Sequence, residues 1–300
     1  MKNLKGSLIL LITAFIWGTA FVAQTSGADN VGAFTFNASR CIIAGIFLLM
    51  VIWIRDKLIN KECKSKWPVK PGILCGVALF LAMSCQQLGI GMYPDDVAAS
   101  GRAGFLTATY VVMVAVAVHI RARKMGVGMD RLVLVSIIVT VAGMYMLCMS
   151  EGISGIYKGD IFELLCALCF TGHIMIADRF SDVDSVKLSC IQFTVCFLLS
   201  GVMCLIFDSP TVSDIKLAWF PIVFAGVMSS GVAYTLQLVG QKYAEPAVAS
   251  IVMSLESVFA ALAGCIILSE VMTGREILGC ELVFVAVIIA QLPQFSHKKS

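Results

Sequence analysis

Charged residues are scarce in this sequence. Aspartate, glutamate, lysine and arginine together make up 14% of its 300 residues, whereas an average soluble domain contains roughly 25%. Hydrophobic residues make up 59%, so the chain has too few charges to cover a surface that faces water. The composition excludes a soluble protein and indicates one that is embedded in lipid.

The sequence also lacks the usual signatures of enzymes and nucleotide-driven pumps. It contains no His-Glu-x-x-His zinc motif and no Gly-x-x-x-x-Gly-Lys phosphate-binding loop, which argues against metal-assisted hydrolysis and nucleotide hydrolysis by this chain. Nearly all of the 12 cysteines fall in apolar segments, where cysteine behaves as a small hydrophobic residue. Cys166 and Cys169 share a helix face, yet no second pair completes a zinc site. We expect no metal, no cofactor and no catalytic residues.

Apolar segments of membrane-spanning length fill the chain. A bilayer core about 30 Å thick requires roughly 20 apolar residues of helix at about 1.5 Å per residue. Ten such segments can be counted, and the loops between them are too short to fold on their own. The predicted spans are residues 6–24, 33–54, 69–92, 97–120, 132–149, 160–177, 186–207, 217–240, 247–268 and 276–292.

Lysine and arginine are distributed unevenly between the two sides of these spans. With a cytoplasmic N-terminus, seventeen of the 22 basic residues fall in inner loops and tails, three in outer loops, and Arg40 and Arg102 within spans. Because cytoplasmic loops carry the excess of positive charge, we expect both termini in the cytoplasm and the protein in the cell membrane. The basic residues follow this topology and form no face of their own, so the net charge of +3 does not indicate a nucleic-acid partner.

The second half of the chain repeats features of the first half at an offset of 150 residues. Because five spans per half is an odd number, two copies enter the membrane with opposite orientations and create a pseudo-symmetric pathway at their interface. We therefore expect one all-α membrane domain of ten helices, built from two inverted five-helix repeats at residues 1–150 and 151–300. The repeated residues are Gln87-Leu88, Tyr93 and Ala99-Ser100, which recur as Gln237-Leu238, Tyr243 and Ala249-Ser250.

Two stretches of the sequence resemble a known family. Residues 15–22 contain Trp17-Gly18, which is similar to a Trp-Gly motif in the first helix of EamA-type transporters of the drug/metabolite transporter (DMT) superfamily. Residues 234–279, with Tyr243, Pro246 and Glu256, resemble the second repeat of that family almost position for position. The resemblance covers essentially the whole chain. It implies a ten-helix membrane carrier with a central cavity that moves metabolites, amino acids or drug-like compounds, often outward.

A secondary carrier is therefore the function that we expect, working as an exporter by alternating access between the two inverted halves. Without a phosphate-binding loop, its energy comes from a gradient, from exchange or from the concentration of the substrate itself. Its expected partners are a small-molecule substrate and the lipid bilayer, while a proton or counter-ion and the oligomeric state stay open. The alternatives are a membrane-embedded enzyme, a channel, and a non-transporting regulatory or scaffold protein.

Glu256, Arg40 and Arg102 are the charged candidates for the site. Glu256 lies about 14 Å along its predicted helix, near the bilayer midplane, where an acidic residue costs about 2.5–3.5 kcal/mol unless it is paired, protonated or faces water. It either locks helices together or contacts the substrate or a proton. The two arginines lie about 8–10 Å from the outer side. They either snorkel outward or line a cavity, where they attract a carboxylate or phosphate or neutralise Glu256.

Polar and aromatic side chains supply the remaining candidates. Tyr234 and Gln237 share one face of their predicted helix, and Gln87 is the repeat counterpart of Gln237. Such a face either joins helices through hydrogen bonds or lines a substrate cavity. His173 is suited either to proton relay or to neutral packing, and Trp17 either to contact with an apolar substrate or to packing.

Overall fold

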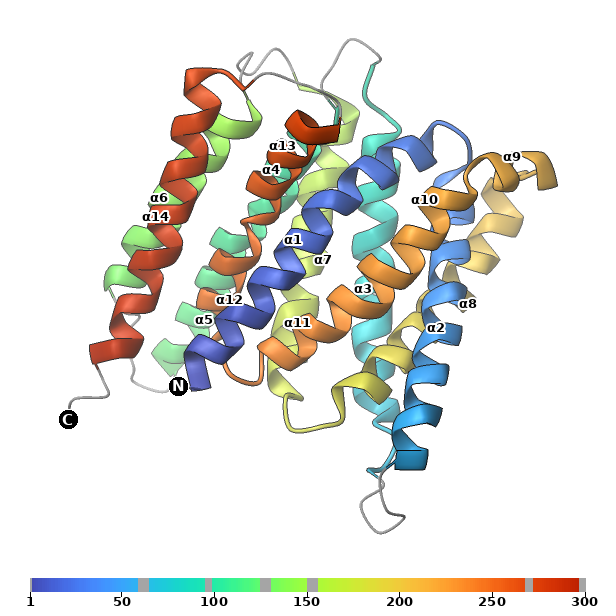
Figure 1. Ribbon diagram of the computed structural model, residues 1–300, viewed down its shortest axis with the longest axis horizontal. Coiled ribbons are helices and arrows are strands. Elements are labelled where there is room, and N and C mark those ends of the chain that lie inside the picture. Colours follow the sequence, from blue (N-terminus) through green and yellow to red (C-terminus); the bar gives the residue numbers. More distant parts are fainter. Residues whose placement is uncertain are drawn as a thin grey trace.

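The computed structural model describes residues 2–58, 65–94, 99–124, 131–149, 156–267 and 272–296, and these residues form helices and their connections without any strand (Figure 1). The predicted boundary between the halves, residues 150 and 151, lies outside the described residues. In chain order the elements are α1 (Lys2–Ala28), α2 (Ala33–Leu58), α3 (Val69–Ile90), α4 (Ala99–Ala108), α5 (Tyr110–Lys124), α6 (Arg131–Cys148), α7 (Lys158–Arg179), α8 (Ser185–Phe207), α9 (Val212–Leu217), α10 (Trp219–Phe224), the π-helix η2 (Ala225–Ala233), α11 (Tyr234–Gly240), α12 (Pro246–Met253), α13 (Glu256–Ile267) and α14 (Gly274–Ser296).

Nine segments of the described chain are long and apolar enough to cross a membrane. They correspond to the first nine predicted spans, beginning with Leu4–Ala28 and ending with Pro246–Ala263. The tenth predicted span, residues 276–292, lies within α14, which is not one of these nine segments. The expectation of an all-helical, multi-pass membrane protein is confirmed.

Three of the predicted spans are not single regular α-helices. Predicted span 97–120 is divided into α4 and α5, and 247–268 is divided into α12 and α13. Predicted span 217–240 contains the π-helix η2 between α10 and α11. Hydropathy is averaged over about 19 residues, so it carries no signal for a break of one or two residues.

Serine side chains account for the break between α12 and α13. The hydroxyl groups of Ser250 and Ser254 donate hydrogen bonds to the carbonyl oxygens of Ala247 and Ile251, at 2.8 and 2.7 Å. A hydroxyl that bonds the backbone of the preceding turn competes with the helical ladder and bends the helix. The chain therefore restarts as a new helix at Glu256.

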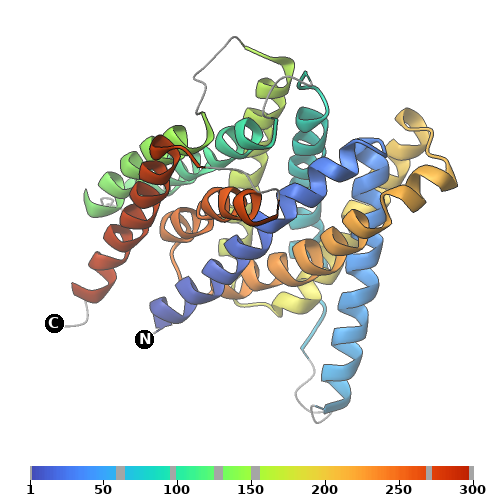
Figure 2. The same cartoon turned by 45° about the horizontal axis from the view of Figure 1, so that its top comes forward.

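Helices from opposite halves of the sequence lie side by side. α6 packs along α14 at one edge of the molecule, and α2 packs along α8 at the other edge (Figure 1). Between these pairs, α3 packs against α7 and α8, while α1 contacts α13, η2 and α11. The turned view in Figure 2 keeps the green and red α6–α14 pair at one end and blue α2 at the other, with α1 between them.

Polar contacts tie α2 to α8 at both of their ends. At one end, a carboxylate oxygen of Asp208 accepts hydrogen bonds from the backbone nitrogen and the hydroxyl of Thr35, at 2.7 and 2.8 Å. At the other end, Asp184 accepts from Arg55 at 3.0 Å and from Ser65 at 2.6 Å. These contacts fix the relative position of two long helices that carry few charges in between.

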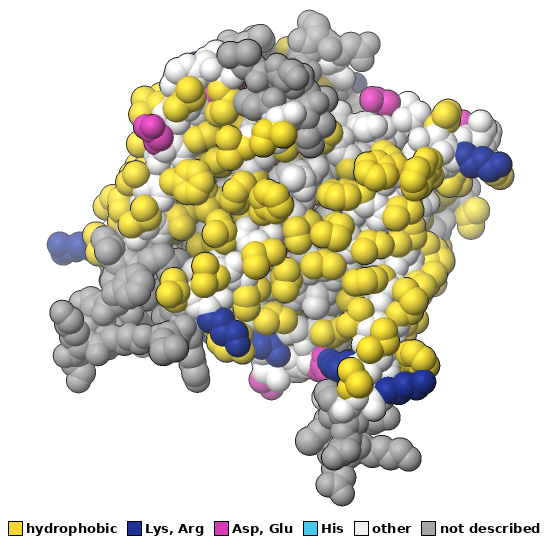
Figure 3. Space-filling view, in the orientation of Figure 1, with side chains coloured by type: hydrophobic (Ala, Val, Ile, Leu, Met, Phe, Trp, Pro, Cys, Tyr) yellow, Lys and Arg dark blue, Asp and Glu magenta, His cyan; other side chains and the backbone are white. Residues whose placement is uncertain are grey.

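Large apolar side chains cover the outer surface. Trp53, Leu205 and Ile266 are 61%, 87% and 81% exposed, and hydrophobic side chains cover the middle of the face seen in Figure 3. Most of the Lys and Arg side chains in that view lie along its lower edge, the side on which both termini lie in Figure 1. An apolar band with a charged border is the surface expected of a protein in a bilayer.

Candidate functional site

A cavity lies at the centre of the helix bundle, and α1, α7, α11 and α13 are among the helices that line it. Its volume is about 30 Å³, which is room for one or two water molecules. Half of its lining residues come before residue 150 and half after it. They are Trp17, Phe21, Gln24, Arg40, Gln86, Thr107, Tyr110, Phe170, Ile174, Ser229, Tyr234, Gln237, Met253 and Glu256.

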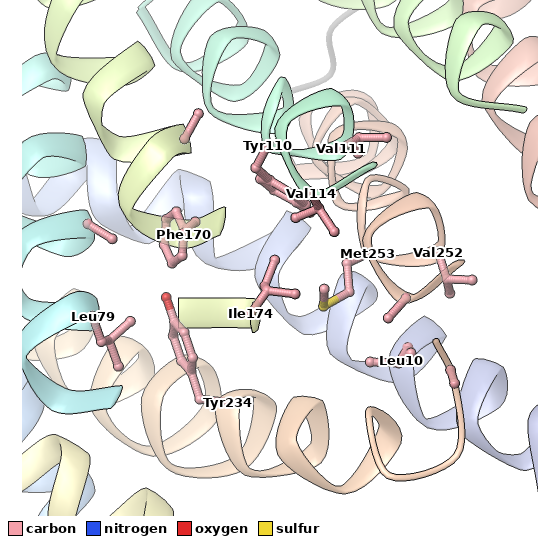
Figure 4. Packing of buried hydrophobic residues seen from close by; sticks show 14 of the residues in the cluster. Leu10, Leu79, Tyr110, Val111, Val114, Phe170, Ile174, Tyr234, Val252 and Met253 are labelled. Atoms are coloured by element: carbon pink, nitrogen blue, oxygen red, sulfur yellow. The ribbon is translucent and has the colours of Figure 1, made fainter. Parts of the chain in front are cut away.

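Aromatic rings form much of the cavity wall. The ring of Tyr234 lies 4.7 Å from that of Trp17, centroid to centroid, and Tyr110 lies 6.4 Å from Phe170. In Figure 4, Tyr234 rises from α11 with its hydroxyl oxygen directed toward Phe170. The wall therefore offers flat apolar surfaces with a few polar atoms among them, as small-molecule sites usually do.

Arg40 brings a positive charge into this wall. Its side chain is 2% exposed; its Nη1 donates to Gln24 Oε1 at 3.0 Å, and its guanidinium lies 5.5 Å from the ring of Phe36. No carboxylate of the described residues lies within 4.0 Å of it. Burying a charge without a counter-charge costs several kcal/mol, so Arg40 lowers the stability of the folded protein in the absence of a ligand.

Glu256 brings a carboxyl group into the same wall. It is the first residue of α13, so the break after α12 places its carboxylate at a helix N-terminus, where the helix dipole favours negative charge. Its Oε1 accepts a long hydrogen bond of 3.5 Å from the hydroxyl of Tyr110. Glu256 and Arg40 do not form an ion pair within 4.0 Å, so the two ionisable side chains line one cavity as separate groups.

Several polar atoms of the cavity wall have no hydrogen-bond partner among the described residues. They are the donors Arg40 Nε and Trp17 Nε1 and the acceptor Gln237 Oε1, all buried. Buried polar atoms are nearly always hydrogen-bonded in folded proteins, and each exception needs an explanation. A ligand or water that enters the cavity would supply the missing partners.

Close packing of α1 against α13 positions Trp17 and Glu256. A Cβ atom added at Gly18 would lie 2.6 Å from Cβ of Phe259 and 2.7 Å from the carbonyl oxygen of Glu256. Only glycine permits this approach. The Trp-Gly pair therefore has two connected roles, because the glycine joins the helices and the preceding Trp17 then faces the cavity.

Five of the eight candidate residues from the sequence lie in the cavity wall, namely Trp17, Arg40, Tyr234, Gln237 and Glu256. Gln87 and His173 do not line it. Gln87 donates from Nε2 to the backbone oxygen of Gln24 at 3.2 Å, and His173 Nε2 lies 3.1 Å from Gln192 Oε1. The ring of His173 meets the ring of Tyr234 edge-on at 6.1 Å, so it lies directly behind the cavity wall.

Arg102, the eighth candidate, is also placed outside the cavity wall. It is 6% exposed and its Nε lies 2.6 Å from Oδ1 of Asp160 in a buried ion pair. The guanidinium also lies over the ring of Tyr157, 4.7 Å from its centroid. Its side chain thus neither reaches the outer surface nor meets Glu256.

Sequence reasoning missed Gln24, Thr107 and Glu163. Phe21 follows Trp17 by four residues and Gln24 follows Phe21 by three, which puts all three on one face of α1; this spacing was available in the sequence. Thr107 lines the cavity and donates to Oε2 of Glu163 at 2.6 Å. Glu163 is fully buried, which no pattern in a helix rich in Leu and Cys indicates.

Comparison with known proteins finds similar sequences along nearly the whole chain. The sequence pattern of the EamA-like transporter family matches residues 4–149 and again residues 157–291. An uncharacterized transporter of Archaeoglobus fulgidus is 28% identical over 293 residues, which cover 97% of this chain and 87% of that protein. Two uncharacterized transporters of Bacillus subtilis are similar over nearly their whole length: YoaV is 22% identical over 98% of this chain and 99% of its own, and YwfM is 23% identical over 96% and 94%.

A solved crystal structure of a protein matches the fold with a TM-score of 0.78 over 97% of both chains, at 18% identity. At this identity the likeness concerns the fold alone. The family pattern, in contrast, covers nearly all of the sequence in two matches. The resemblance seen in Trp17-Gly18 and in residues 234–279 is thereby confirmed, and the chain belongs to the EamA-like transporter family.

Proposed function

We propose that this protein is a secondary carrier that moves a small organic metabolite, an amino acid or a drug-like compound out of the cell through its central cavity. The observation that carries the proposal is the cavity itself, because it is lined by both halves of the chain and its wall contains two buried ionisable residues, Arg40 and Glu256. Ionisable residues inside a membrane are costly and usually mark a transport pathway.

The helix packing supports two halves related by a pseudo-twofold axis. With the predicted spans numbered one to ten, α2–α8 joins spans two and seven, and α6–α14 joins spans five and ten. The contact of α3 with α7 joins spans three and six, and its counterpart, of η2 and α11 with α1, joins spans eight and one. In Figure 1, α1 runs upward from the N-terminus and α7 runs downward. These relations favour an inverted repeat with α14 as the tenth span.

Two glycine contacts support the same relation in atomic detail. A Cβ atom at Gly6 would lie 2.9 Å from Cβ of Tyr243, and one at Gly159 would lie 2.8 Å from Cζ of Tyr93. Tyr93 and Tyr243 are counterparts in the sequence repeat. A glycine near the start of spans one and six therefore packs against the corresponding tyrosine, through Cβ of Tyr243 in one case and Cζ of Tyr93 in the other.

A cavity of about 30 Å³ is too small for an organic metabolite, since pockets for such ligands measure roughly 300–1,000 Å³. The present conformation therefore represents a closed state, and transport requires opening toward one side at a time. The breaks between α4 and α5 and between α12 and α13, together with η2, are the places where the wall helices change direction most easily.

The charge distribution supports cytoplasmic termini, because Lys and Arg side chains gather on the side of the termini (Figure 3). The direction of flux follows from the family resemblance, and the energy source from the absence of a phosphate-binding loop. A proton gradient is the first candidate, because Glu256 lies in the cavity wall.

Reconstitution into liposomes tests the proposal. We expect saturable flux of at least one member of a panel of amino acids and organic metabolites, with or without stimulation by an imposed pH gradient. Flux that grows linearly with concentration at high ion conductance would identify a channel instead. Complete absence of flux, with the folded protein verified in the same vesicles, would contradict the carrier.

A further inference from the structure

We propose that Arg40 is the anchor for a carboxylate of the substrate, and that the substrate is a small organic monoanion with an aromatic or apolar body. The inference rests on the proposed function, because it takes the central cavity as the substrate site. It is carried by the environment of Arg40, a buried cation that has no acidic partner within 4.0 Å among the described residues and whose Nε has no hydrogen-bond partner among them.

The other buried cations of the described chain have acidic partners. Arg102 lies 2.6 Å from Asp160, and Lys187 lies 3.9 Å from Asp56. Arg40 is as deeply buried as Lys187, at 2% exposure, yet its partners are the neutral Gln24 and the face of Phe36. The fold therefore pairs buried cations elsewhere and leaves this one unpaired at the cavity.

Two donors at the cavity are available to an incoming anion. Nε of Arg40 and Nε1 of Trp17 are buried and unpartnered among the described residues, and both side chains line the cavity. A guanidinium binds a carboxylate through parallel hydrogen bonds. Gln24 holds Nη1 at 3.0 Å, which fixes the guanidinium before the ligand arrives and lowers the entropy lost on binding.

The neighbouring side chains define the rest of the ligand. Trp17, Phe21, Phe170 and Tyr234 all line the same cavity, so a body attached to the carboxylate meets aromatic rings. The direct contacts of Arg40, Gln24 and Phe36, are neutral. Glu256 lines the same cavity but lies more than 4.0 Å from the guanidinium, so Arg40 can balance one negative charge of a ligand. A phosphate monoester carries close to two charges at neutral pH and would leave part of its charge buried without a partner, so the carboxylate is the better match.

Binding in detergent tests the inference independently of transport. The chain has four tryptophans, and Trp53, Trp67 and Trp219 are 61%, 45% and 61% exposed. Replacing these three by Phe leaves Trp17 as the fluorescent probe. We expect 3-phenylpropionate to change its emission saturably, acetate to bind more weakly, and the neutral 3-phenylpropanamide to bind at least roughly tenfold more weakly than its acid, because the charge-assisted hydrogen bond is lost.

Variants of Arg40 provide a second test of the inference. Arg40→Gln should weaken 3-phenylpropionate binding roughly tenfold or more and leave the amide unchanged, and Arg40→Lys should fall between. Arg121→Gln removes an exposed cation that pairs with Asp178 and serves as the matched control with unchanged binding. Equal binding of acid and amide, no binding of any carboxylate, or an Arg40→Gln variant with unchanged affinity would each overturn the inference.

Thermal stability separates an anchor from a structural residue. Without ligand, Arg40→Gln should unfold at the same temperature as the unsubstituted protein or a higher one, because it removes an uncompensated buried charge. A lower unfolding temperature, or failure to fold, would mean that Arg40 supports the structure, and the inference would fall. Saturable flux of neutral or cationic compounds only, in liposomes, would support the carrier and contradict the anion site. Binding of carboxylates through Arg40 without any flux would support the anion site and contradict the carrier.

Discussion

Arg102 and Asp160 form a buried, two-pronged ion pair between α4 and the first turn of α7. Arg102 Nε and Nη2 lie 2.6 and 2.7 Å from the two carboxylate oxygens of Asp160. The hydroxyl of Tyr93 and the backbone nitrogen of Tyr157 also donate to this carboxylate, each at 2.9 Å. The pair holds together three segments that meet at the side of the molecule opposite the termini (Figure 1).

Removing one partner of this pair should destabilise the protein without changing its ligand preference. Arg102→Gln or Asp160→Asn leaves a buried charge uncompensated, at a cost of roughly 3–5 kcal/mol. The double variant Arg102→Met with Asp160→Leu should recover most of that loss. Unfolding in detergent measures the four proteins. Equal losses in the single and double variants would show that packing, and not charge pairing, is what the substitutions disturb.

Glu256→Gln should keep the fold and remove the response of transport to a pH gradient. The substitution preserves the shape of the side chain and removes the titratable carboxylate from the cavity wall. Gradient-stimulated flux should therefore fall roughly tenfold or more, which corresponds to a free-energy difference of about 1.4 kcal/mol. Flux in liposomes with and without the gradient measures the effect. Glu245→Gln, on an exposed residue before α12, is the control, and a Glu256→Gln protein that responds normally would remove Glu256 from coupling.

The sequence predicts five of the fourteen residues that line the cavity, because the signals for these five are local. Trp17 and Glu256 belong to short motifs, and Arg40 is conspicuous as a charge within an apolar span. It is harder to predict which face of a helix points toward the cavity, since adjacent residues point about 100° apart. Gln87 was therefore the predicted site residue, whereas its neighbour Gln86 lines the cavity.

The remaining differences come from contacts between distant segments. Arg102 was expected either to snorkel outward or to line the cavity, because its partner Asp160 lies 58 residues away and is the first residue of its predicted span. The broken helices were missed for another reason. A serine that bonds the preceding turn, such as Ser254, looks the same in sequence as one that packs between helices.

Gly18→Ala should destabilise the protein and disturb the cavity. The added methyl group would lie within 2.8 Å of atoms of Phe259, Glu256 and Ala260, which forces α1 away from α13 at a cost of about 1–3 kcal/mol. Gly45→Ala is the matched control, since nothing lies within 4 Å of its new Cβ and Ala is the better helix former. Comparable unfolding temperatures for both variants would contradict this account of the Trp-Gly motif.

Asp184 should make stability depend on acidity below about pH 4. Burial opposes its ionisation, but hydrogen bonds from Arg55, Ser65 and the backbone of Lys187 outweigh burial and lower its pKa from 3.8 to about 2. Because the folded-state pKa is depressed, its contribution is complete above the unfolded-state value and is lost as pH falls through the folded-state value.

Unfolding temperatures measured between pH 6 and pH 2.5 check this dependence. Asp184→Asn should be less stable than the unsubstituted protein at pH 6, and the difference should shrink toward pH 2.5. Asp29→Asn, at an exposed position, should show no such convergence. A difference that stays constant with pH would place the effect of Asp184 in its shape rather than its charge.

The repeated glycine contacts make a prediction about alternating access. Gly6 approaches Tyr243 on the side of the termini, and Gly159 approaches Tyr93 on the opposite side. A wedge at either position, Gly6→Leu or Gly159→Leu, should separate the helices on its own side. If the halves rock about a common centre, the two wedges should favour opposite open states. Gly201→Leu, whose new Cβ meets nothing within 4 Å, should leave the balance unchanged.

Thiol labelling in sealed vesicles reads this balance. Ser229 lines the cavity, and Ser229→Cys would report access from each side through a membrane-impermeant reagent, measured above the labelling of the parent chain. Gly6→Leu should raise labelling from the side of the termini and lower it from the other side, and Gly159→Leu should do the reverse. If both substitutions opened the same side, rocking of two symmetry-related halves would be contradicted. A pseudo-twofold axis requires that equivalent changes on the two sides favour opposite open states.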